Sequence, residues 1–410
     1  MRRIDTLVVG GGQAGLAMSR CLSDRRIDHV VLERGEVAER WRRERWRSLR
    51  LLTPNWMTRL PGFAYDGPDP DGYMRVADVV TFLERYAEGS QAPVITGAAV
   101  ESMRAADGGY DVHTTAGAWR ARQVVVATGH CDTPLVPGLA RQAAGRLTQL
   151  VPGDYRAPDA LPDGGVLVVG ASASGLQIAD ELVRAGRRVV VAAGQHTRVP
   201  RLYRGRDLFR WFDQLGILRE ATDAVPDLSA SRAQPSLQLV GRPTHESIDL
   251  RGLAGRGATV VGRLVALDGV RATFDDDLIA TTAAADLKLA ILLGRLDRQN
   301  ADVAPPPFVP HWPAFADARV HTRDLDREGI RIVLWATGFQ RRYPWLQVPV
   351  LDGRGEIVHR RGVTPLPGLF ALGLHFLRHR SSSFLDGVGV DAAALAGAIA
   401  ANLGHHGAAA

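Results

Sequence analysis

Two glycine-rich turns are the parts of this 410-residue sequence best suited to chemistry. The first, VVGGGQAG, ends an apolar, β-branched run and is followed by LAMSRCL, which has helical spacing. In such a turn Gly10 permits the tight bend, Gly12 lets the backbone approach a pyrophosphate, and Gly15 lets the helix pack close to the strand. The amides at the helix start then bind the phosphates. The turn predicts a dinucleotide site, with a glycine turn that holds no ligand as the alternative.

The next predicted strand, HVVLE, supports the dinucleotide site. It ends in Glu33, 23 residues after Gly10, where an acid binds a ribose 2′-hydroxyl. A carboxylate at this position repels a 2′-phosphate, so the first site favours FAD or NAD over NADP. Three neighbouring residues complete the contacts expected here: Gln13, Ala14 and Arg34.

The second turn, VVGASASG, repeats the design of the first. Gly170 and Gly175 are in place, and SGLQIADELVRAG is an amphipathic helix. Ser172 replaces the middle glycine, but its side chain is small and its hydroxyl can donate to a phosphate oxygen. The sequence therefore predicts a second working nucleotide site, with Ala173 and Ser174 at its helix start.

The residues that follow the second strand of each unit differ in charge between the two units. The position matching Glu33 is Ala193, and His196, Arg198 and Arg201 come after it. Because guanidinium groups make bidentate bonds to phosphate, these side chains predict a 2′-phosphate site and NADPH as its ligand. The alternative is a solvated basic loop. Since a flavin accepts a hydride and passes electrons onward, we assign FAD to the first site and NADPH to the second.

Two repeats of an apolar strand followed by Ala-Thr-Gly, VVVATGH and VLWATGF, bracket the second unit. The bracketing predicts an α/β fold of two Rossmann-like dinucleotide-binding domains, with the NADPH domain inserted in the FAD domain. The expected boundaries are 1–158 and 325–410 for the FAD domain and 159–324 for the NADPH domain. The cofactor contacts expected from the repeats are Ala127, Thr128, Gly129, Thr337 and Gly338.

The last segment, from GLFALG onward, reads as a strand, a polar loop and an alanine-rich helix that begins near Asp391. We expect Asp386 and Gly387 to contact the flavin. Exposed amides at 387–389 would stabilise the negative charge of a reduced flavin at the helix N-terminus. An ordinary packing helix after a glycine loop is the alternative.

Composition excludes several classes of protein. The net charge is +6, but the arginines are spread along the chain and Lys288 is the only lysine, so we expect no nucleic-acid partner. Cys21 and Cys131 form neither a CxxC pair nor a metal-ligand pattern, which disfavours a disulfide reductase and a metal site and fits a cytoplasmic location. No run of 18 apolar residues occurs, so we expect no membrane span.

Four stretches together resemble the class B flavoprotein monooxygenases, which include flavin-containing monooxygenases, YUCCA enzymes and Baeyer-Villiger enzymes. They are GGGQAG, the two Ala-Thr-Gly crossovers, WRRERWRSLRLLTPNW with the following LPG, and HTRVPRLYRGRD. The resemblance covers essentially the whole chain and is greatest to a bacterial branch. It implies bound FAD, reduction by NADPH, and O2 adding to the flavin to give a peroxyflavin that oxygenates a small molecule.

The resemblance also implies roles for individual residues. Trp41 and Trp46 are expected to line the flavin site, with Thr53 beside it. Asn55 is the expected catalytic donor to the peroxide, and a turn residue after Pro54 is its alternative. In flavin-containing monooxygenases the asparagine directly follows a threonine, whereas here Pro54 separates the two.

One departure from the family pattern reduces the number of reactions to be considered. Val151 and Pro152 stand where a His-Ser pair is expected, which disfavours Baeyer-Villiger chemistry and leaves His130 as a candidate for the missing histidine. The favoured reaction is hydroxylation or N- or S-oxygenation. The alternative is an NADPH-dependent flavin reductase that passes electrons to a quinone or a carrier protein. Substrate identity and oligomeric state stay open, with a homodimer as one alternative.

Overall fold

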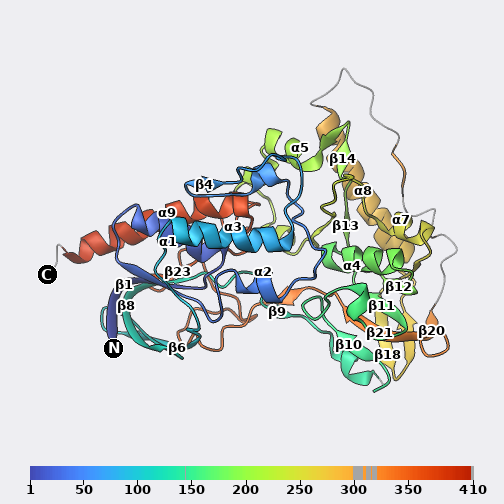
Figure 1. Ribbon diagram of the computed structural model, residues 1–410, viewed down its shortest axis with the longest axis horizontal. Coiled ribbons are helices and arrows are strands. Elements are labelled where there is room, and N and C mark those ends of the chain that lie inside the picture. Colours follow the sequence, from blue (N-terminus) through green and yellow to red (C-terminus); the bar gives the residue numbers. More distant parts are fainter. Residues whose placement is uncertain (144, 299–307, 311–314, 316–320, 408–410) are drawn as a thin grey trace.

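Two α/β domains lie side by side along the long axis of the molecule (Figure 1). The computed structural model describes residues 1–143, 145–298, 308–310, 315 and 321–407. Both chain ends belong to the first domain, and the second domain is formed by the middle of the chain. This arrangement confirms the predicted fold class of two dinucleotide-binding domains.

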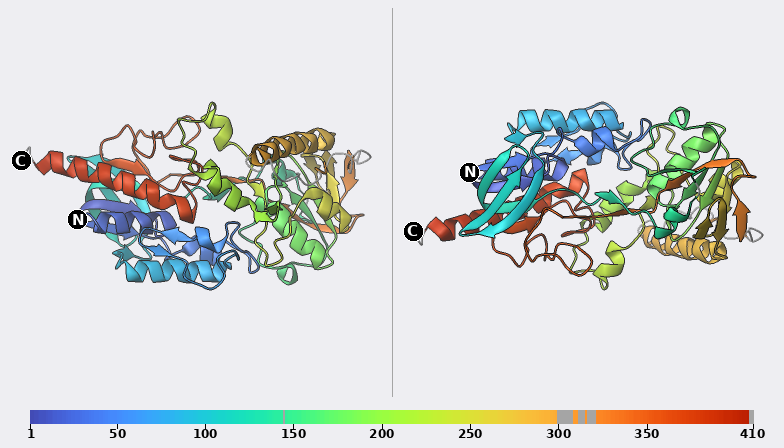
Figure 2. Two further views of the ribbon diagram at one scale, coloured as in Figure 1. Left: turned by 90° about the horizontal axis from the view of Figure 1, so that it is seen from above. Right: turned by 90° about the horizontal axis from the view of Figure 1, so that it is seen from below.

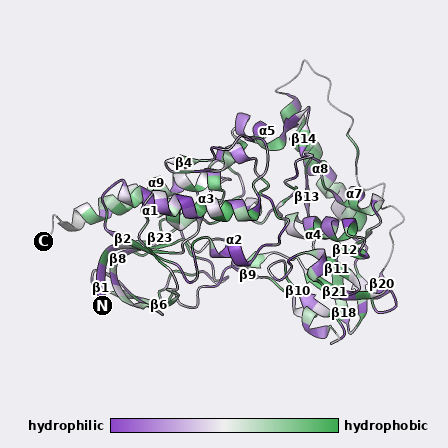
Figure 3. Ribbon diagram, viewed as in Figure 1, coloured by the Kyte–Doolittle hydropathy of each residue, from purple (hydrophilic) through white to green (hydrophobic). Residues whose placement is uncertain are grey.

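The first domain is built on a seven-stranded sheet of order β5-β2-β1-β8-β7-β6, with β23 beside β8. Its strands are β1 (Arg2–Val9), β2 (His29–Leu32), β5 (Val94–Ile95), β6 (Val100–Ala106), β7 (Gly109–Thr114), β8 (Gly117–Val126) and β23 (Leu369–Ala371). The helices are α1 (Gln13–Ser23), α2 (Glu39–Arg43), α3 (Val76–Gly89) and α9 (Leu385–Gly407). Shorter elements are η1 (Asn55–Met57), β3 (Arg59–Leu60), β4 (Phe63–Ala64), β9 (Thr133–Pro134) and β22 (Phe339–Gln340). The short helix η2 (Gly138–Gln142) follows β9 in the chain but packs on the second domain. Hydrophobic and hydrophilic residues alternate along α3, as expected of a helix with one buried face (Figure 3).

The second domain has a parallel sheet of order β10-β21-β11-β12-β17 and a three-stranded antiparallel sheet β18-β19-β20. The parallel strands are β10 (Thr148–Leu150), β11 (Gly165–Val169), β12 (Val189–Ala192), β17 (Thr259–Val261) and β21 (Ile330–Trp335). The antiparallel strands are β18 (Leu264–Asp268), β19 (Arg271–Phe274) and β20 (Thr322–Asp324). The helices are α4 (Ala173–Arg184), α5 (Leu208–Gln214), α6 (Leu228–Arg232), α7 (Leu250–Gly255) and α8 (Leu278–Asp297). Shorter elements are η3 (Pro158–Ala160), β13 (Thr197–Arg198), β14 (Leu202–Tyr203), β15 (Arg206–Asp207), η4 (Ile217–Arg219) and β16 (Leu237–Gln238).

Both domain boundaries in the structure differ from those expected from the sequence. β10 and β21 both pair within the second sheet, so this domain begins before residue 159 and extends beyond residue 324. The reason is that each Ala-Thr-Gly repeat crosses its own glycine turn. A Cβ at Gly10 would lie 2.6 Å from the Ala127 carbonyl oxygen, and one at Gly170 would lie 2.4 Å from that of Ala336. The second repeat therefore belongs to the inserted domain, and the chain returns to the first domain after it.

Helix α9 begins at Leu385, earlier than the predicted start near Asp391. Within the described residues, it is the one helix long and apolar enough to cross a membrane, with a mean hydropathy of 1.4 over Leu385–Gly404. It lies alongside α1 (Figure 2), and buries Leu395 and Ile399 in the core of the first domain. Packing in the core explains the apolar residues on that face of the helix.

A buried ion pair joins the two domains. Arg201 has no exposed side chain, and its Nη2 donates to Asp207 Oδ1 at 2.8 Å while its Nη1 donates to the Leu52 carbonyl at 2.7 Å. The Tyr73 hydroxyl donates to Asp207 Oδ2 at 2.7 Å. Leu52 and Tyr73 belong to the first domain, so Arg201 and Asp207 hold that segment against the second. The prediction that Arg201 binds a 2′-phosphate was wrong, because its guanidinium is buried in this interface and paired with Asp207.

Loss of this ion pair should lower the stability of the folded protein. Arg201→Met leaves the Asp207 carboxylate buried without its cation, and we expect the free energy of unfolding to fall by about 3–5 kcal/mol. Chemical denaturation measures the change. Arg206→Met, in the same hairpin but exposed, should change it by less than about 0.5 kcal/mol, and Arg201→Met with Asp207→Asn should recover part of the loss. Equal losses for Arg201→Met and Arg206→Met would contradict this role.

Candidate functional site

A cavity of about 1270 Å³ lies between the two domains and is lined by residues of both. The first domain contributes the glycine turn after β1, the ends of β2 and β8, α2 and the loop before α9. The second domain contributes β13, α5, η4, the segment around β16, and α8. The first predicted nucleotide unit and part of the second therefore face one shared space.

The structure brings most of the predicted first-unit residues together around this cavity. Those that line it are Gly10, Gly12, Gln13, Ala14, Glu33, Arg34, Trp41, Thr53, Ala127, Thr128 and Gly129. Gly15 and Gly12 differ in the space that surrounds them. A Cβ at Gly15 would lie 1.8 Å from the Gly10 carbonyl oxygen, whereas a Cβ at Gly12 would meet nothing within 4 Å. Gly15 closes the turn, and Gly12 leaves an open cradle at the start of α1 that fits a pyrophosphate.

Glu33 is held rigidly beside this cradle. It is buried, its Oε2 accepts the Gly11 amide at 2.6 Å and its Oε1 accepts the Gly35 amide at 2.9 Å. A carboxylate has about four acceptor positions, so these two bonds leave capacity for a ribose hydroxyl. The residues present therefore fit the adenosine half of a dinucleotide.

The other end of the cradle is joined to the loop before α9. Gln13 Nε2 donates to the Ser383 carbonyl at 2.7 Å, and Trp41 Nε1 donates to Gln13 Oε1 at 3.2 Å. Ser383 and Leu385 line the cavity, so the start of α9 faces the same space as the start of α1.

Asp386 and Gly387 were predicted to contact the flavin from the loop before the last helix, but they lie in α9 and do not line the cavity. Asp386 is buried and pairs with Arg59 and with Arg219. Gly387 lies within the helix and donates its amide to the Phe384 carbonyl, and a Cβ there would lie 1.9 Å from the Ser381 carbonyl oxygen. Both residues pack the first turn of α9, which the earlier helix start explains.

Asn55 and Trp46 are also placed away from the cavity lining. Asn55 lies in η1, is buried, and donates its Nδ2 to the Asp69 carbonyl at 2.9 Å. Trp46 packs in the core of the second domain, with its ring centroid 6.4 Å from that of Tyr155. These positions favour the structural alternative for Asn55, and they make Trp46 a core residue of the second domain and not part of the cavity wall.

The second glycine turn has the geometry of the first. A Cβ at Gly175 would lie 2.1 Å from the Gly170 carbonyl oxygen, as at the corresponding pair of the first unit. Ser172 precedes α4, and Ala173 donates its amide to Ser236 Oγ at 3.4 Å. Ser236 lines the cavity, but the turn does not. The residues predicted in the second glycine turn and the second Ala-Thr-Gly repeat therefore lie outside the cavity lining: Gly170, Ser172, Ala173, Ser174, Gly175, Thr337 and Gly338.

The three basic residues predicted to bind a 2′-phosphate make contacts within the protein. Arg198 pairs with Asp286 at 2.6 Å and with Asp249 at 3.7 Å. The Nδ1 of the buried His196 ring is 2.9 Å from the Gly194 carbonyl oxygen. With Arg201 in the domain interface, none of the three lines the cavity. Sequence spacing gave no sign of these partners, since Asp286 lies 88 positions from Arg198.

Two histidines that the sequence did not connect meet in the cavity. His130, after the first Ala-Thr-Gly, and His375, after β23, both line it, with ring centroids 6.0 Å apart. Burial lowers the pKa of His130 to about 4, and nearby arginine charge acts in the same direction. Burial, and then the charge of His130, lower the pKa of His375 to about 4. Both rings are therefore neutral at neutral pH, and each can accept a hydrogen bond from a bound molecule.

Comparison with known proteins agrees with this geometry. Residues 7–202 match the family described as pyridine nucleotide-disulphide oxidoreductase. A CzcO-like uncharacterized oxidoreductase of Geobacillus kaustophilus is 30% identical over 95% of this chain and 96% of its own length. A YUCCA-type indole-3-pyruvate monooxygenase of Oryza sativa subsp. japonica is 26% identical over 88% of this chain and 82% of its own. The chain belongs to the class B flavoprotein monooxygenase family.

Solved structures agree on the fold of this flavoprotein. The flavin-containing monooxygenase of Stenotrophomonas maltophilia superposes with a TM-score of 0.67 at 20% identity, covering 98% of this chain and 99% of that one. The bacillithiol disulfide reductase of Staphylococcus aureus superposes with a TM-score of 0.62 at 12% identity, covering 98% of this chain and 99% of that one. These structures show the fold. Membership of the family makes the chain a flavin-dependent oxidoreductase, and its relatives imply the use of flavin and NAD(P)H.

Two glycine substitutions should separate cofactor binding from folding. Gly12→Ala places a methyl group in the open cradle, so we expect flavin content to fall while the thermal stability of the flavin-free protein stays the same. Gly15→Ala forces the turn apart and should lower the free energy of unfolding by about 1–3 kcal/mol or more. Flavin absorbance per protein and thermal melting measure both effects. Full flavin content in Gly12→Ala would contradict the assignment of the cradle.

The histidine pair should make stability sensitive to acid. Histidines of the unfolded chain take up protons near their ordinary pKa of 6.5, whereas folded His130 and His375 do so only near 4, so stability is lost as the pH falls from the first value to the second. Denaturation at several pH values should show a shallower loss for His130→Asn with His375→Asn than for the unaltered protein. His113→Asn, at an exposed site, is the matched control. Identical pH profiles for all three proteins would refute the half-buried, neutral pair.

Proposed function

We propose that this flavoprotein is an FAD- and NADPH-dependent monooxygenase that hydroxylates, or oxygenates at nitrogen or sulfur, a small organic molecule. The observation that carries the proposal is the single cavity lined both by the first nucleotide unit and by apolar residues of the second domain. A bound flavin supplies hydride acceptance from the nicotinamide and the activation of dioxygen. The chain's own residues must then bind the cofactor, orient it and exclude water.

The first glycine turn would bind the flavin cofactor. The open side of Gly12 and the amides at the start of α1 fit the pyrophosphate, and Glu33 fits the adenosine ribose. The contact between Gln13 and the Ser383 carbonyl fixes the start of α9 at the far end of the cradle. The dinucleotide would therefore extend from Glu33 toward Leu385.

Apolar residues of the second domain, together with Phe384 of the first, would exclude water. Phe209 and Phe212 of α5, Leu218 of η4 and Phe384 before α9 form an apolar wall of the cavity. A dry wall is what oxygen transfer requires, because water and stray protons release the activated oxygen as hydrogen peroxide. The wall also fits an apolar or aromatic substrate better than a charged one.

The cysteines do not favour the disulfide reductases that share this fold. Cys21 is buried in the core of the first domain, and Cys131 lines the cavity in a different part of the same domain. Because the two thiols are separated, the chain has no dithiol pair of the kind used in disulfide exchange. The monooxygenase names of the relatives support oxygen transfer instead.

Isotope labelling tests the proposal directly. The FAD-loaded protein is given NADPH, ¹⁸O₂ and a panel of amines, sulfides, indoles and ketones. We expect at least one product that contains a single ¹⁸O atom, formed with the consumption of one NADPH. An absence of labelled product, together with NADPH oxidation that starts only when a quinone is added, would instead support the flavin reductase.

A further inference from the structure

We propose that the outer face of helix α8 binds a second copy of this chain, with the two helices packed antiparallel across a two-fold axis. α8 spans Leu278–Asp297 and lies at the edge of the second domain (Figure 2). Its inner face packs in the domain through Leu278, Leu289 and Leu296, which are all buried. The proposal goes beyond the proposed function, because it concerns association of the chain and not the reaction.

The outer face of α8 carries a continuous apolar stripe. Ala280, Ala284, Leu287 and Ile291 follow one another at intervals of four, three and four residues, which places them on one side of the helix. Leu287 and Ile291 are 63% and 66% exposed, whereas a helix at a domain surface is usually polar on its outer side. We call these four residues the α8 stripe.

A ligand in the cavity cannot cover the α8 stripe. Ile291 lines the cavity, but Ala280, Ala284 and Leu287 do not. All four side chains are exposed in a single copy of the chain. Because an exposed apolar stripe of this kind marks an interaction site, the partner is a macromolecule that approaches α8 from outside.

The α8 stripe is complementary to itself when a second copy is turned around. In an antiparallel pair centred between Ala284 and Leu287, Ala280 of each copy faces Ile291 of the other, and Ala284 faces Leu287. Each bulky side chain then lies against an alanine, so the two helices can approach closely. A two-fold axis makes every contact twice, as an interface between identical copies requires.

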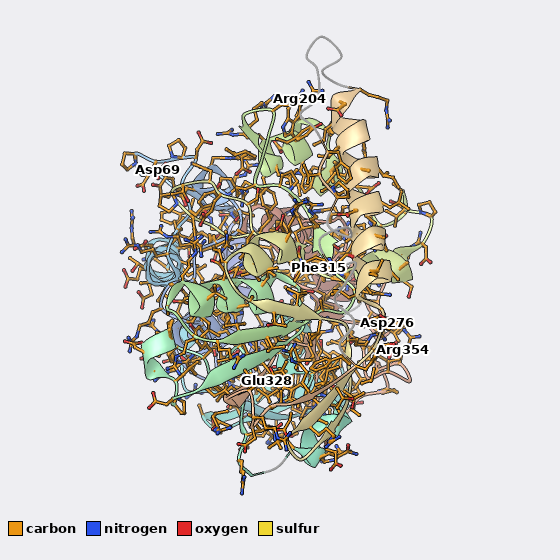
Figure 4. All side chains as sticks on the ribbon, turned by 90° about the vertical axis from the view of Figure 1, so that its right-hand side faces the viewer. Asp69, Arg204, Asp276, Phe315, Glu328 and Arg354 are labelled. Carbon is orange, nitrogen blue, oxygen red and sulfur yellow. The ribbon has the colours of Figure 1, made fainter. Side chains whose placement is uncertain are left out.

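The charges at the two ends of α8 favour the antiparallel direction. Asp275 and Asp276 precede the helix, and Figure 4 shows Asp276 beside one end of it. Arg295 and Arg298 lie at the other end, and all four side chains are exposed without an ion pair among the described residues. An antiparallel pair brings the acidic end of each helix to the basic end of the other, whereas a parallel pair brings like charges together. The exposed carboxylates also disfavour an anionic membrane as the partner.

Analytical ultracentrifugation over a range of protein concentrations tests the association. A contact between two helices of about 30 Å is small for a protein interface, so we expect a monomer–dimer equilibrium with a micromolar dissociation constant. Leu287→Arg places two like charges beside the two-fold axis and should raise this constant by about a hundredfold. The thermal stability of the monomer should stay the same, because the side chain is exposed. Val358→Arg, at an apolar site of the first domain that is 47% exposed, is the matched control and should leave the constant unchanged.

Disulfide cross-linking tests the direction of the two helices. In the antiparallel pair, the two copies of residue 284 are offset by about 4.5 Å along the helix axis and the two copies of residue 280 by about 16 Å. We therefore expect Ala284→Cys to form a disulfide between copies under mild oxidation, and Ala280→Cys not to do so. Asp276→Arg should weaken the dimer, and Asp276→Arg with Arg295→Asp should restore it.

Three results would overturn the proposal. They are a protein that stays monomeric at every concentration, a dimer that Leu287→Arg leaves intact, and equal cross-linking of Ala280→Cys and Ala284→Cys. The first two would show that a second copy does not cover the α8 stripe, and the third would show that the helices are not antiparallel.

Discussion

The buried ion pair between Arg201 and Asp207 is the contact on which the shared cavity depends. It reaches from the second domain to the backbone at Leu52 and the hydroxyl of Tyr73 in the first. Gly241 packs against the same segment, where a Cβ would lie 2.2 Å from the Leu51 carbonyl oxygen. Separation of the domains would leave the buried Arg201 guanidinium without the Leu52 carbonyl and the Asp207 carboxylate without the Tyr73 hydroxyl, so these contacts favour one relative position of the two domains. Transfer of a hydride between two bound cofactors requires this kind of fixed approach.

Within each domain a second constraint is repeated. A glycine turn is pressed against the carbonyl of an Ala-Thr-Gly crossover, at Gly10 with Ala127 and at Gly170 with Ala336. In both units the last glycine of the turn then closes on the first, and in the first unit the helix start at Gly12 is left open for phosphate. The repeat explains why two units with different middle residues, Gly12 and Ser172, keep the same backbone path.

The sequence was sufficient for the features that depend on local patterns. Apolar runs, glycine spacing and the two Ala-Thr-Gly repeats predicted the two-domain fold and most of the first-site lining, including Glu33. It was insufficient where a distant residue decides the role of a side chain. Arg198 is paired with Asp286 on α8, and the approach of His375 to His130 requires β23 to lie beside β8. The helix start at Leu385 was missed because the glycines before Asp391 suggested a loop, although tertiary packing favours a helix there.

The most direct test of the account is the anaerobic reduction of bound flavin by NADPH. With FAD in the first site and the nicotinamide in the same cavity, the flavin absorbance should disappear with one equivalent of NADPH, and more slowly when the transferred hydrogen is deuterium. A protein that binds flavin but keeps its colour with both NADPH and NADH would contradict the claim that the two nucleotide units act on one shared cavity.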